Sequence, residues 1–277
     1  MRLSEATEKA LVACVRDIAA QEILPRFGAL DPTDIAAKSR ADDLVTIADR
    51  EAERCLTEAM SRILPGAAVI GEEAVSENAA LRDEIAVADR SVIIDPVDGT
   101  WNFAHALPLF GVIIAIAERG ETIWGLIYDP VGDDWAIASK GQGARLESAS
   151  GKTIPLKLED VPGDDASSLS GYAHAFLAKG DERRRMFDRL TAFHRVDALR
   201  CSAHEYRLLG RGAVDFCLSG ILNPWDHAAG CLIAEEAGGV ARMLDGRPYR
   251  PDIQAGRVLA ARSESVWNAV AGALDGA

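Results

Sequence analysis

The sequence lacks several features that would place it in other classes of protein. Its 277 residues contain no apolar run approaching the ~20 residues needed to cross a bilayer, and the stretch MRLSEATEKALVACVRDIAA mixes charged and apolar residues at helical spacing, unlike a signal peptide. The five cysteines are scattered and form no C-x-x-C pair, which indicates free thiols in a reducing compartment. We therefore expect a cytoplasmic protein without a membrane-spanning segment.

Positive charge and histidine are also scarce. Thirty Lys and Arg residues stand against 43 Asp and Glu residues, which gives a net charge of −13 and disfavours nonspecific binding to nucleic acid. The five histidines show no pair at the spacing of metal ligands. Any metal site should therefore be built from oxygen ligands, which favours Mg²⁺ or Mn²⁺ over Zn²⁺.

What is present is the composition of an ordinary globular protein, with 48% hydrophobic and 26% charged residues. Polar residues from 147 to 168 suggest a boundary, so we expect an α+β half at 1–150 and an α/β half at 151–277. Turn residues after 118 predict an antiparallel meander. Periodicity predicts helices over 4–24, 49–63, 181–193, 202–211, 226–237 and 264–274, and strands over 67–73, 91–100, 167–174, 214–218 and 257–261.

Carboxylates stand at the end of an apolar strand or at the start of a helix at three places that are far apart in the chain. Glu72 follows AAVIG, Asp95 and Asp98 follow SVII, and Asp226 opens a predicted helix. Each one alone would be an ordinary solvated acid or turn residue. Gathered in one pocket they would repel one another, and divalent cations would hold them ionised. Two such ions could activate a water molecule and steady the leaving oxygen in phosphoryl transfer.

Gly99 and Thr100 follow the paired aspartates directly and precede a short helix predicted over 102–106. A glycine at the start of a helix presents backbone N–H groups that bind phosphate, and the hydroxyl of Thr100 could hold an attacking water. Asp226 lies in the first turn of its predicted helix, where a carboxylate is favoured. These positions together suggest a phosphate site beside a metal site.

Three stretches resemble the signatures of the inositol monophosphatase family of lithium-sensitive, Mg²⁺-dependent sugar phosphatases. They are GEE at 71–73, IIDPVDGTWNF at 93–103 and PWDHAAG at 224–230, and KSRADDLVTIAD at 38–49 is similar to the family's upstream motif. The resemblance implies an α+β fold layered as an αβαβα sandwich, and a homodimer. It also implies hydrolysis of a small polyol or sugar phosphate by direct attack of metal-activated water, with inhibition by Li⁺.

The same resemblance implies roles for individual residues. Glu72, Asp95 and the Val97 carbonyl would hold a first Mg²⁺, and Asp95, Asp98 and Asp226 would hold a second, with a third, weaker ion near Glu72. Asp49 would hydrogen-bond Thr100 or a bound water and so orient the nucleophile. The implied catalytic set is Glu72, Thr100 and Asp49, and the implied substrate contacts are Asp98, Gly99, Thr100, Ser202, Ser219 and Asp226.

Three positions depart from the family pattern and leave the substrate open. Ser219 stands where relatives that prefer inositol phosphate carry an acid, and Cys201-Ser202-Ala203 stands where the family shows Gly-Ser/Thr-Ala. Trp101 argues against a nucleotide bisphosphate and is either a packing residue or a substrate contact. Histidinol phosphatase, fructose-1,6-bisphosphatase and nucleotide bisphosphate phosphatase activities stay open as alternatives. A non-enzymatic RNA-associated transcription accessory protein is a further alternative, which the acidic composition disfavours.

Several polar residues near these motifs have simpler interpretations. We expect His227 to be a structural residue of its helix, and two of His204, Glu205 and Arg207 to be solvated on theirs.

Overall fold

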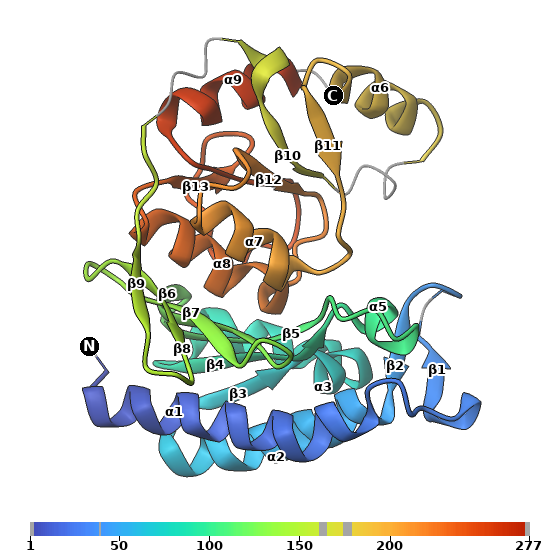
Figure 1. The fold of residues 1–277 in the computed structure, drawn as a ribbon, viewed down its shortest axis with the longest axis vertical. Coiled ribbons are helices and arrows are strands. Elements are labelled where there is room, and N and C mark those ends of the chain that lie inside the picture. The colour runs from blue at the N-terminus through green and yellow to red at the C-terminus, as the bar shows by residue number, and fades with distance from the viewer. Residues whose placement is uncertain (1–2, 39, 161–164, 174–178, 275–277) are drawn as a thin grey trace.

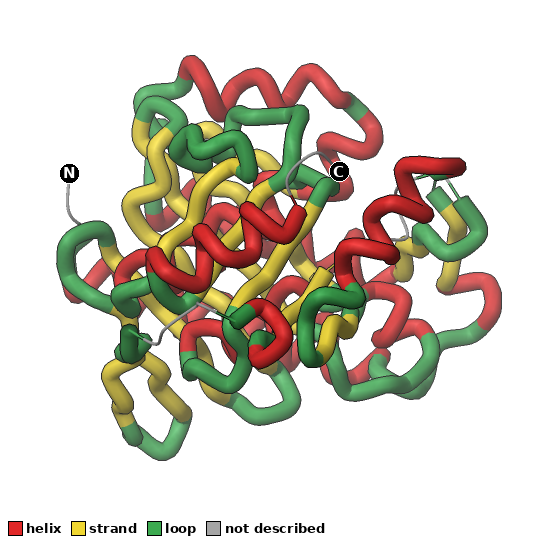
Figure 2. Tube along the Cα trace, turned by 90° about the horizontal axis from the view of Figure 1, so that it is seen from above, coloured by secondary structure: helices red, strands yellow, loops and turns green. Residues whose placement is uncertain are grey.

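The computed structural model describes residues 3–38, 40–160, 165–173 and 179–274, and it folds into five layers (Figure 1). A pair of helices covers one face of a seven-stranded sheet, and a second pair separates that sheet from a five-stranded sheet. Two further helices cover the outer face of the second sheet. The expected α+β sandwich with αβαβα layers is confirmed, and the view from above shows helices lying across the strands (Figure 2).

The first helical layer consists of α1 (Glu5–Ile18) and α2 (Ile47–Ile63). Their apolar faces form one core with one side of the seven-stranded sheet, as their amphipathic spacing predicts. The helix predicted over 4–24 is α1 followed by a π-helical turn at Ala19–Ile23 and a 3₁₀ turn at Leu24–Arg26, so its hydrogen-bond pattern changes before Pro25.

The seven-stranded sheet has the order β3-β4-β5-β6-β7-β8-β9. β3 and β4 are parallel, and every later pair is antiparallel, so the predicted meander is confirmed. β9 extends this sheet past residue 150, and the division of the chain there stays a prediction. The strands are β3 (Ala68–Gly71), β4 (Ser91–Asp98), β5 (Gly111–Glu118), β6 (Glu121–Asp129), β7 (Asp134–Ser139), β8 (Ala144–Ser148) and β9 (Thr153–Leu156).

Short elements at the edge of this sheet surround the candidate site. A hairpin of β1 (Ile35–Ala37) and β2 (Leu44–Thr46) was not predicted, because each strand has three residues and a polar turn joins them. The helices there are α3 (Glu72–Glu77), α4 (Glu84–Val87) and α5 (Thr100–Ala104). The helix predicted at 102–106 begins two residues earlier, because Gly99 adopts a left-handed conformation that ends the strand.

The second half of the chain builds a five-stranded sheet in the order β11-β10-β12-β14-β13. β10 is parallel to both of its neighbours, whereas β12, β14 and β13 are antiparallel, so the sheet is mixed rather than wholly parallel. Strands β11 and β13 were not predicted. The elements are β10 (Ser170–Ala173), α6 (Gly180–Leu190), β11 (Arg195–Asp197), α7 (Ser202–Gly210), β12 (Phe216–Ser219), α8 (Pro224–Glu236), β13 (Val240–Met243), β14 (Val258–Ala261) and α9 (Glu264–Leu274).

Helix α8 lies between the two sheets, and this position explains its composition. It contacts β4, β5, β6, β7 and β8 of one sheet and β13 and β14 of the other. A helix covered on both sides must be apolar on both sides, and every residue from Trp225 to Ala234 except Asp226 is buried. The carboxylate of Asp226 is therefore brought into the interior by a helix that is buried on both sides.

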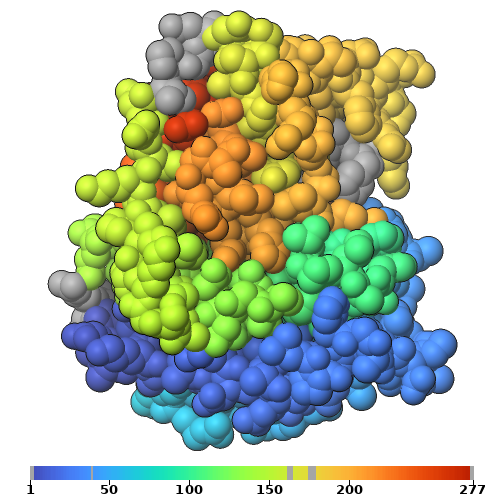
Figure 3. All heavy atoms as spheres, in the orientation of Figure 1, coloured from blue at the N-terminus to red at the C-terminus, as the bar shows by residue number. Residues whose placement is uncertain are grey.

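The two halves of the chain also meet around α5. The side chain of Asn102 donates hydrogen bonds to the carbonyl oxygens of Leu109 and Leu199, both at 2.9 Å. In the space-filling view, the green surface of residues near 100–110 lies directly against the second half (Figure 3). Among the described residues, no helix combines the length and the apolar character needed to cross a membrane.

Candidate active site

A β-bulge in β4 places Asp95 and Asp98 in one site. Asp95 pairs with Ile113 of β5 and Asp98 pairs with Gly111, so β4 has one more residue than β5 between the two pairs. In a regular strand, residues three apart point to opposite faces, and one extra residue reverses that relation. Pro96 lies within the bulge, where the regular hydrogen bonding between the strands is interrupted, so a residue without a backbone N–H is tolerated there.

Asp226 joins these two residues from the opposite side of the pocket. One carboxylate oxygen from each of Asp95, Asp98 and Asp226 lies within 4.8 Å of the other two. Asp226 sits at the third position of α8, after Pro224, and Asn223 donates a hydrogen bond to its Oδ2 atom at 3.3 Å. The three carboxylates from two distant segments thus meet as the sequence predicts.

The start of α7 fixes the orientation of Asp98. The Ala203 N–H donates a hydrogen bond to Asp98 Oδ2 at 2.6 Å, and the buried thiol of Cys201 contacts the same oxygen at 3.0 Å. Gly99, the next residue, has φ +90°, and a Cβ atom there would lie 2.7 Å from the Leu109 carbonyl oxygen. A side chain at this position would clash with the carbonyl oxygen, so the turn after Asp98 requires a glycine.

All three aspartates hold their protons more tightly than usual. Burial raises the pKa of Asp95 and of Asp226 well above the ordinary value, and the nearby carboxylates raise both further. Burial also raises the pKa of Asp98, to about 6, although the Ala203 N–H and Cys201 lower it. An all-oxygen set of mutually repelling carboxylates is the donor set that Mg²⁺ or Mn²⁺ takes, so these residues fit such an ion.

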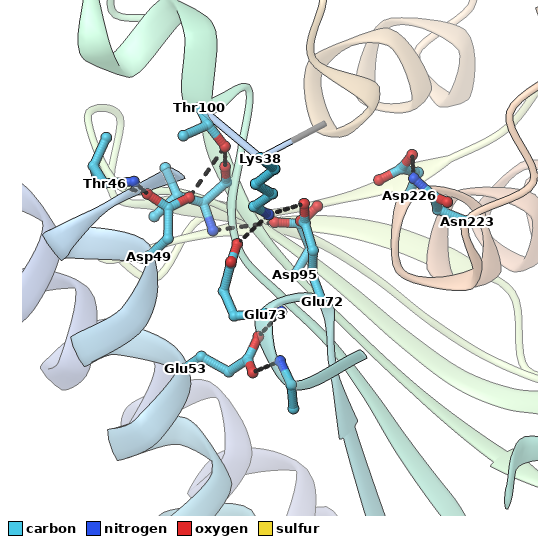
Figure 4. A network of polar contacts seen from close by, with 12 residues as sticks. Lys38, Thr46, Asp49, Glu53, Glu72, Glu73, Asp95, Thr100, Asn223 and Asp226 are labelled. Carbon is cyan, nitrogen blue, oxygen red and sulfur yellow. Dashed lines mark hydrogen bonds and ion pairs between the residues drawn. The ribbon is translucent and has the colours of Figure 1, made fainter. Parts of the chain in front are cut away.

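A second acidic group lies beside the aspartates and contains its own base (Figure 4). The Lys38 ammonium is 2.8 Å from Glu72 Oε1 and 2.5 Å from Glu73 Oε1, and the three side chains are 80–89% covered. The buried Glu53 carboxylate accepts the N–H groups of Glu73 and Ala74, both at 2.8 Å. The negative charge of Glu72 contributes to the raised pKa of Asp95 and of Asp226, so Glu72 lies near these aspartates. It is not a member of the close cluster of Asp95, Asp98 and Asp226.

Asp49 links the start of α2 to Thr100. Its Oδ2 atom accepts hydrogen bonds from the Thr46 N–H at 2.8 Å and the Thr46 hydroxyl at 2.5 Å, which completes the N-terminal cap of α2. Its Oδ1 atom lies 3.1 Å from the Thr100 hydroxyl, as the resemblance implies. That hydroxyl is also 3.0 Å from the Val97 carbonyl, which is the predicted metal ligand, and burial raises the pKa of Asp49 to about 6.

A pocket of about 160 Å³ opens beside these residues. Its lining includes the predicted metal ligands Glu72, Asp98 and Asp226 together with Gly99 and Thr100 of the predicted phosphate site. The predicted substrate contacts Ser202 and Ser219 line the same pocket. The Ser219 hydroxyl accepts the Ile221 N–H at 3.1 Å, and Ser219 therefore presents a neutral and partly satisfied group to the pocket.

The other polar residues of α7 and α8 have structural contacts. His227 is buried, with Nε2 2.6 Å from the Ile221 carbonyl oxygen and Nδ1 3.1 Å from the Tyr206 hydroxyl, so its structural role is confirmed. The expectation that two of His204, Glu205 and Arg207 are solvated is wrong. Glu205 and Arg207 are buried, and His204 is 3.2 Å from the Phe110 carbonyl oxygen, because α7 lies between two layers.

The sequence gives no indication of the roles of two residues in this region. Glu53 lies within a predicted helix and is identified only by its hydrogen bonds. Arg200 lines the pocket, and an arginine between a short strand and a helix gives no indication of that position. Glu73 belongs to the GEE motif, but its contact with Lys38 could not be read from the sequence. Lys38 was noted as part of a motif, but its partners could not be read from the sequence.

Comparisons with known proteins show the family of the chain. The model of the inositol monophosphatase family matches residues 4–275. A Thermotoga maritima protein named fructose-1,6-bisphosphatase/inositol-1-monophosphatase is 31% identical over 229 residues, which are 81% of this chain and 80% of that protein. A Bacillus subtilis inositol-1-monophosphatase is 33% identical, with 78% of each chain covered. The Nus factor SuhB of Vibrio cholerae is 31% identical over 82% of this chain and 80% of its own.

The fold also matches solved structures. The structure of the Thermotoga maritima IMPase superimposes with a TM-score of 0.79 and covers 98% of this chain and 97% of its own, at 24% identity. At that identity the superposition establishes the shared fold.

Proposed function

Because the chain belongs to the inositol monophosphatase family of phosphoric monoester hydrolases, we propose that it hydrolyses a small polyol or sugar phosphate with the help of Mg²⁺. The observation that carries this proposal is the meeting of Asp95, Asp98 and Asp226, which come from distant segments and have raised pKa values. Burying three such carboxylates together is costly unless a cation neutralises them.

Asp95, Asp98 and Asp226 would hold one Mg²⁺, and Glu72, Asp95 and the Val97 carbonyl would hold another, with Mn²⁺ able to replace it. When bound, the ions supply the Lewis acidity that activates water and stabilises negative charge on the leaving oxygen. A third ion near Glu72 would need the Lys38 ammonium to move, because that ammonium occupies one oxygen of Glu72.

Thr100 and Asp49 would orient the attacking water. The Thr100 hydroxyl has one hydrogen and lies near two acceptors, Asp49 Oδ1 at 3.1 Å and the Val97 carbonyl at 3.0 Å. With that hydrogen donated, its oxygen can accept a hydrogen from water in the pocket. Asp49 has a pKa of about 6, so it is ionised at neutral pH and can hold Thr100 in this orientation.

The substrate phosphate would lie against the backbone of Gly99 and Thr100, which line the pocket. Its organic part would then contact Ser202 and Ser219, which line the same pocket. The name of the Thermotoga maritima relative includes fructose-1,6-bisphosphatase, which makes a sugar bisphosphate the second candidate substrate. A transcription accessory role, suggested by the SuhB relative, has less support because a binding protein does not need the buried carboxylates.

A phosphate-release screen tests the proposal. The purified protein would be assayed with Mg²⁺, with Mn²⁺ and with a chelator against inositol 1-phosphate, histidinol phosphate, fructose 1,6-bisphosphate, glycerol phosphate and a nucleotide bisphosphate. We expect Mg²⁺-dependent release from at least one ester, with inhibition by Li⁺. Absence of release from every ester would overturn the proposal, and release that survives the chelator would overturn its metal dependence.

A further inference from the structure

Arg200, which lines the pocket, has an unusual backbone conformation. Its φ angle is +56°, in the left-handed region that non-glycine residues rarely adopt. It precedes Cys201, whose thiol contacts Asp98, and it lines the same pocket as Gly99 and Thr100. Strained residues persist where the surrounding structure holds them, and they gather at binding sites. The position of Arg200 therefore calls for an explanation.

The side chain of Arg200 is held by two segments of the first half of the chain. Its guanidinium lies over the ring of Trp101, with the Cζ atom 4.4 Å from the ring centroid. Its Nη2 atom donates a hydrogen bond to the Asp42 carbonyl oxygen at 3.1 Å, across the hairpin of β1 and β2. Trp101 in turn stacks on His105 with ring centroids 4.1 Å apart. Arg200 is thus fixed in place although a third of its side chain is exposed.

The charges around Arg200 leave room for an anion. The Asp42 carboxylate lies between two arginines, 3.6 Å from Arg200 and 3.5 Å from Arg40, and it is half exposed to solvent. Such loose and exposed ion pairs are weak. Asp43 lines the same pocket and has polar partners of its own. Ser202, Ser219 and Ile221, which also line the pocket, carry no charge.

We propose that Arg200, positioned by Trp101, binds a second anionic group on the organic part of the substrate. The inference rests on the proposed function, because the same pocket must take the phosphate that is hydrolysed. The guanidinium presents a planar fork of N–H donors that matches a carboxylate or a phosphate bidentately. The favoured substrates are therefore phosphate monoesters that carry a second phosphate or a carboxylate, rather than neutral polyol phosphates.

Paired substrates test the proposal. Phosphate release by the wild type would be compared between fructose 1-phosphate and fructose 1,6-bisphosphate, and between glycerol 3-phosphate and 3-phosphoglycerate. We expect R200Q to lower kcat/KM by about 10–100-fold for the esters with a second anion, mainly through KM, because it removes a hydrogen bond to a charged group. The neutral esters should change less than about threefold. The bisphosphate and the carboxylate pairs show which anion the site prefers.

Further variants separate binding from structure. R200K keeps the charge without the fork and should have an intermediate effect. W101L should reproduce the substrate selectivity of R200Q, and W101F should restore part of the wild-type selectivity because it keeps an aromatic face. R119Q, at an exposed site whose ion pair is 82% and 91% exposed, is the matched control. Unfolding midpoints would be measured for each variant.

Two outcomes separate this inference from the proposed function. If the wild type hydrolyses neutral esters with Mg²⁺ but R200Q affects charged and neutral esters equally or affects neither, the inference is overturned and the proposed function stands. If the wild type hydrolyses no ester at all, the proposed function fails, and the inference fails with it.

Discussion

Two buried acidic groups lie side by side in this protein, and they are neutralised in different ways. Glu72 and Glu73 share the ammonium of Lys38, and Glu53 accepts two backbone N–H groups (Figure 4). Among the described residues, the three aspartates Asp95, Asp98 and Asp226 have no ion pair with a base.

The difference assigns a role to each group. The glutamate group has its own positive charge, so it can be stable in the absence of a metal ion. The aspartate group has none, so its carboxylates either take up protons or bind cations. Loss of the base Lys38 from the glutamate group should therefore act mainly on stability, and loss of a carboxylate from the aspartate group should act mainly on turnover.

The largest expected effect is on turnover, in the aspartate group. Asp95→Asn should lower kcat/KM by about 10³-fold or more, because Asp95 is the proposed ligand of both ions and metal charge stabilisation amounts to several kcal/mol. The fold should persist, since the amide has the size of the carboxylate it replaces. Mg²⁺-dependent phosphate release, Mg²⁺ titration calorimetry and circular dichroism would be measured.

The control for this variant is Asp89→Asn, because the Asp89 side chain is 91% exposed and lies outside the pocket. It should leave turnover unchanged. Turnover by Asp95→Asn near the wild-type level would contradict the assignment of Asp95 as a metal ligand.

The second effect is on stability, in the glutamate group. Lys38→Met should lower the free energy of unfolding of the metal-free protein by about 3–5 kcal/mol, because it leaves Glu72 and Glu73 without their shared base. Added Mg²⁺ should recover part of this loss, since a cation can then approach Glu72. Urea unfolding with a chelator and with Mg²⁺ measures both quantities. Lys9→Met, at an exposed pair on α1, is the matched control, and an equal effect of the two variants would contradict the comparison.

The sequence carries the information for the site more fully than for the fold around it. Asp95, Asp98 and Asp226 could be predicted because two follow an apolar strand and the third opens an apolar helix, and acids buried with such segments need a partner. Strands β3 to β8 of the seven-stranded sheet could be predicted because they contain apolar runs bounded by turn residues, whereas β9 lies in the polar stretch 147–168 and was not predicted. The motifs also carried the family resemblance.

The rest depends on contacts that no local pattern shows. The hairpin of β1 and β2 and strands β11 and β13 are short, so their stability comes from pairing rather than from their own residues. The bulge between Asp95 and Asp98 appears only when β4 is aligned with β5. Likewise, the burial of Glu205 and Arg207 follows from the layers that enclose α7.

A smaller effect is expected on the pH dependence of stability. Without divalent cations the folded protein holds the proton of Asp98 with a pKa of about 6, above the ordinary 3.8. A raised carboxyl pKa contributes stability that is present below the unfolded pKa and lost as the pH rises through the folded pKa. Between about pH 4 and pH 7 the wild type should therefore lose about 3 kcal/mol more than Asp98→Asn, which cannot titrate there.

Urea unfolding of both proteins with a chelator, at intervals across this range, measures the difference. Mg²⁺ should oppose the loss in the wild type, because it binds the ionised carboxylates. Parallel stability curves for the wild type and Asp98→Asn would show that Asp98 is not protonated in the metal-free protein.

The smallest effect is expected at Thr100, whose hydroxyl is proposed to orient the attacking water. Thr100→Val should lower kcat about 10–100-fold with little change in KM or Mg²⁺ affinity, because it removes the hydroxyl beside Asp49 and leaves the carboxylates in place. Thr100→Ser keeps the hydroxyl and should retain most of the activity, so the pair separates the hydroxyl from the methyl group. Steady-state kinetics with saturating Mg²⁺ measures each parameter. Equal losses in the two variants would mean that Thr100 contributes packing rather than the orientation of water, and a large change in Mg²⁺ affinity would instead place the hydroxyl among the metal contacts.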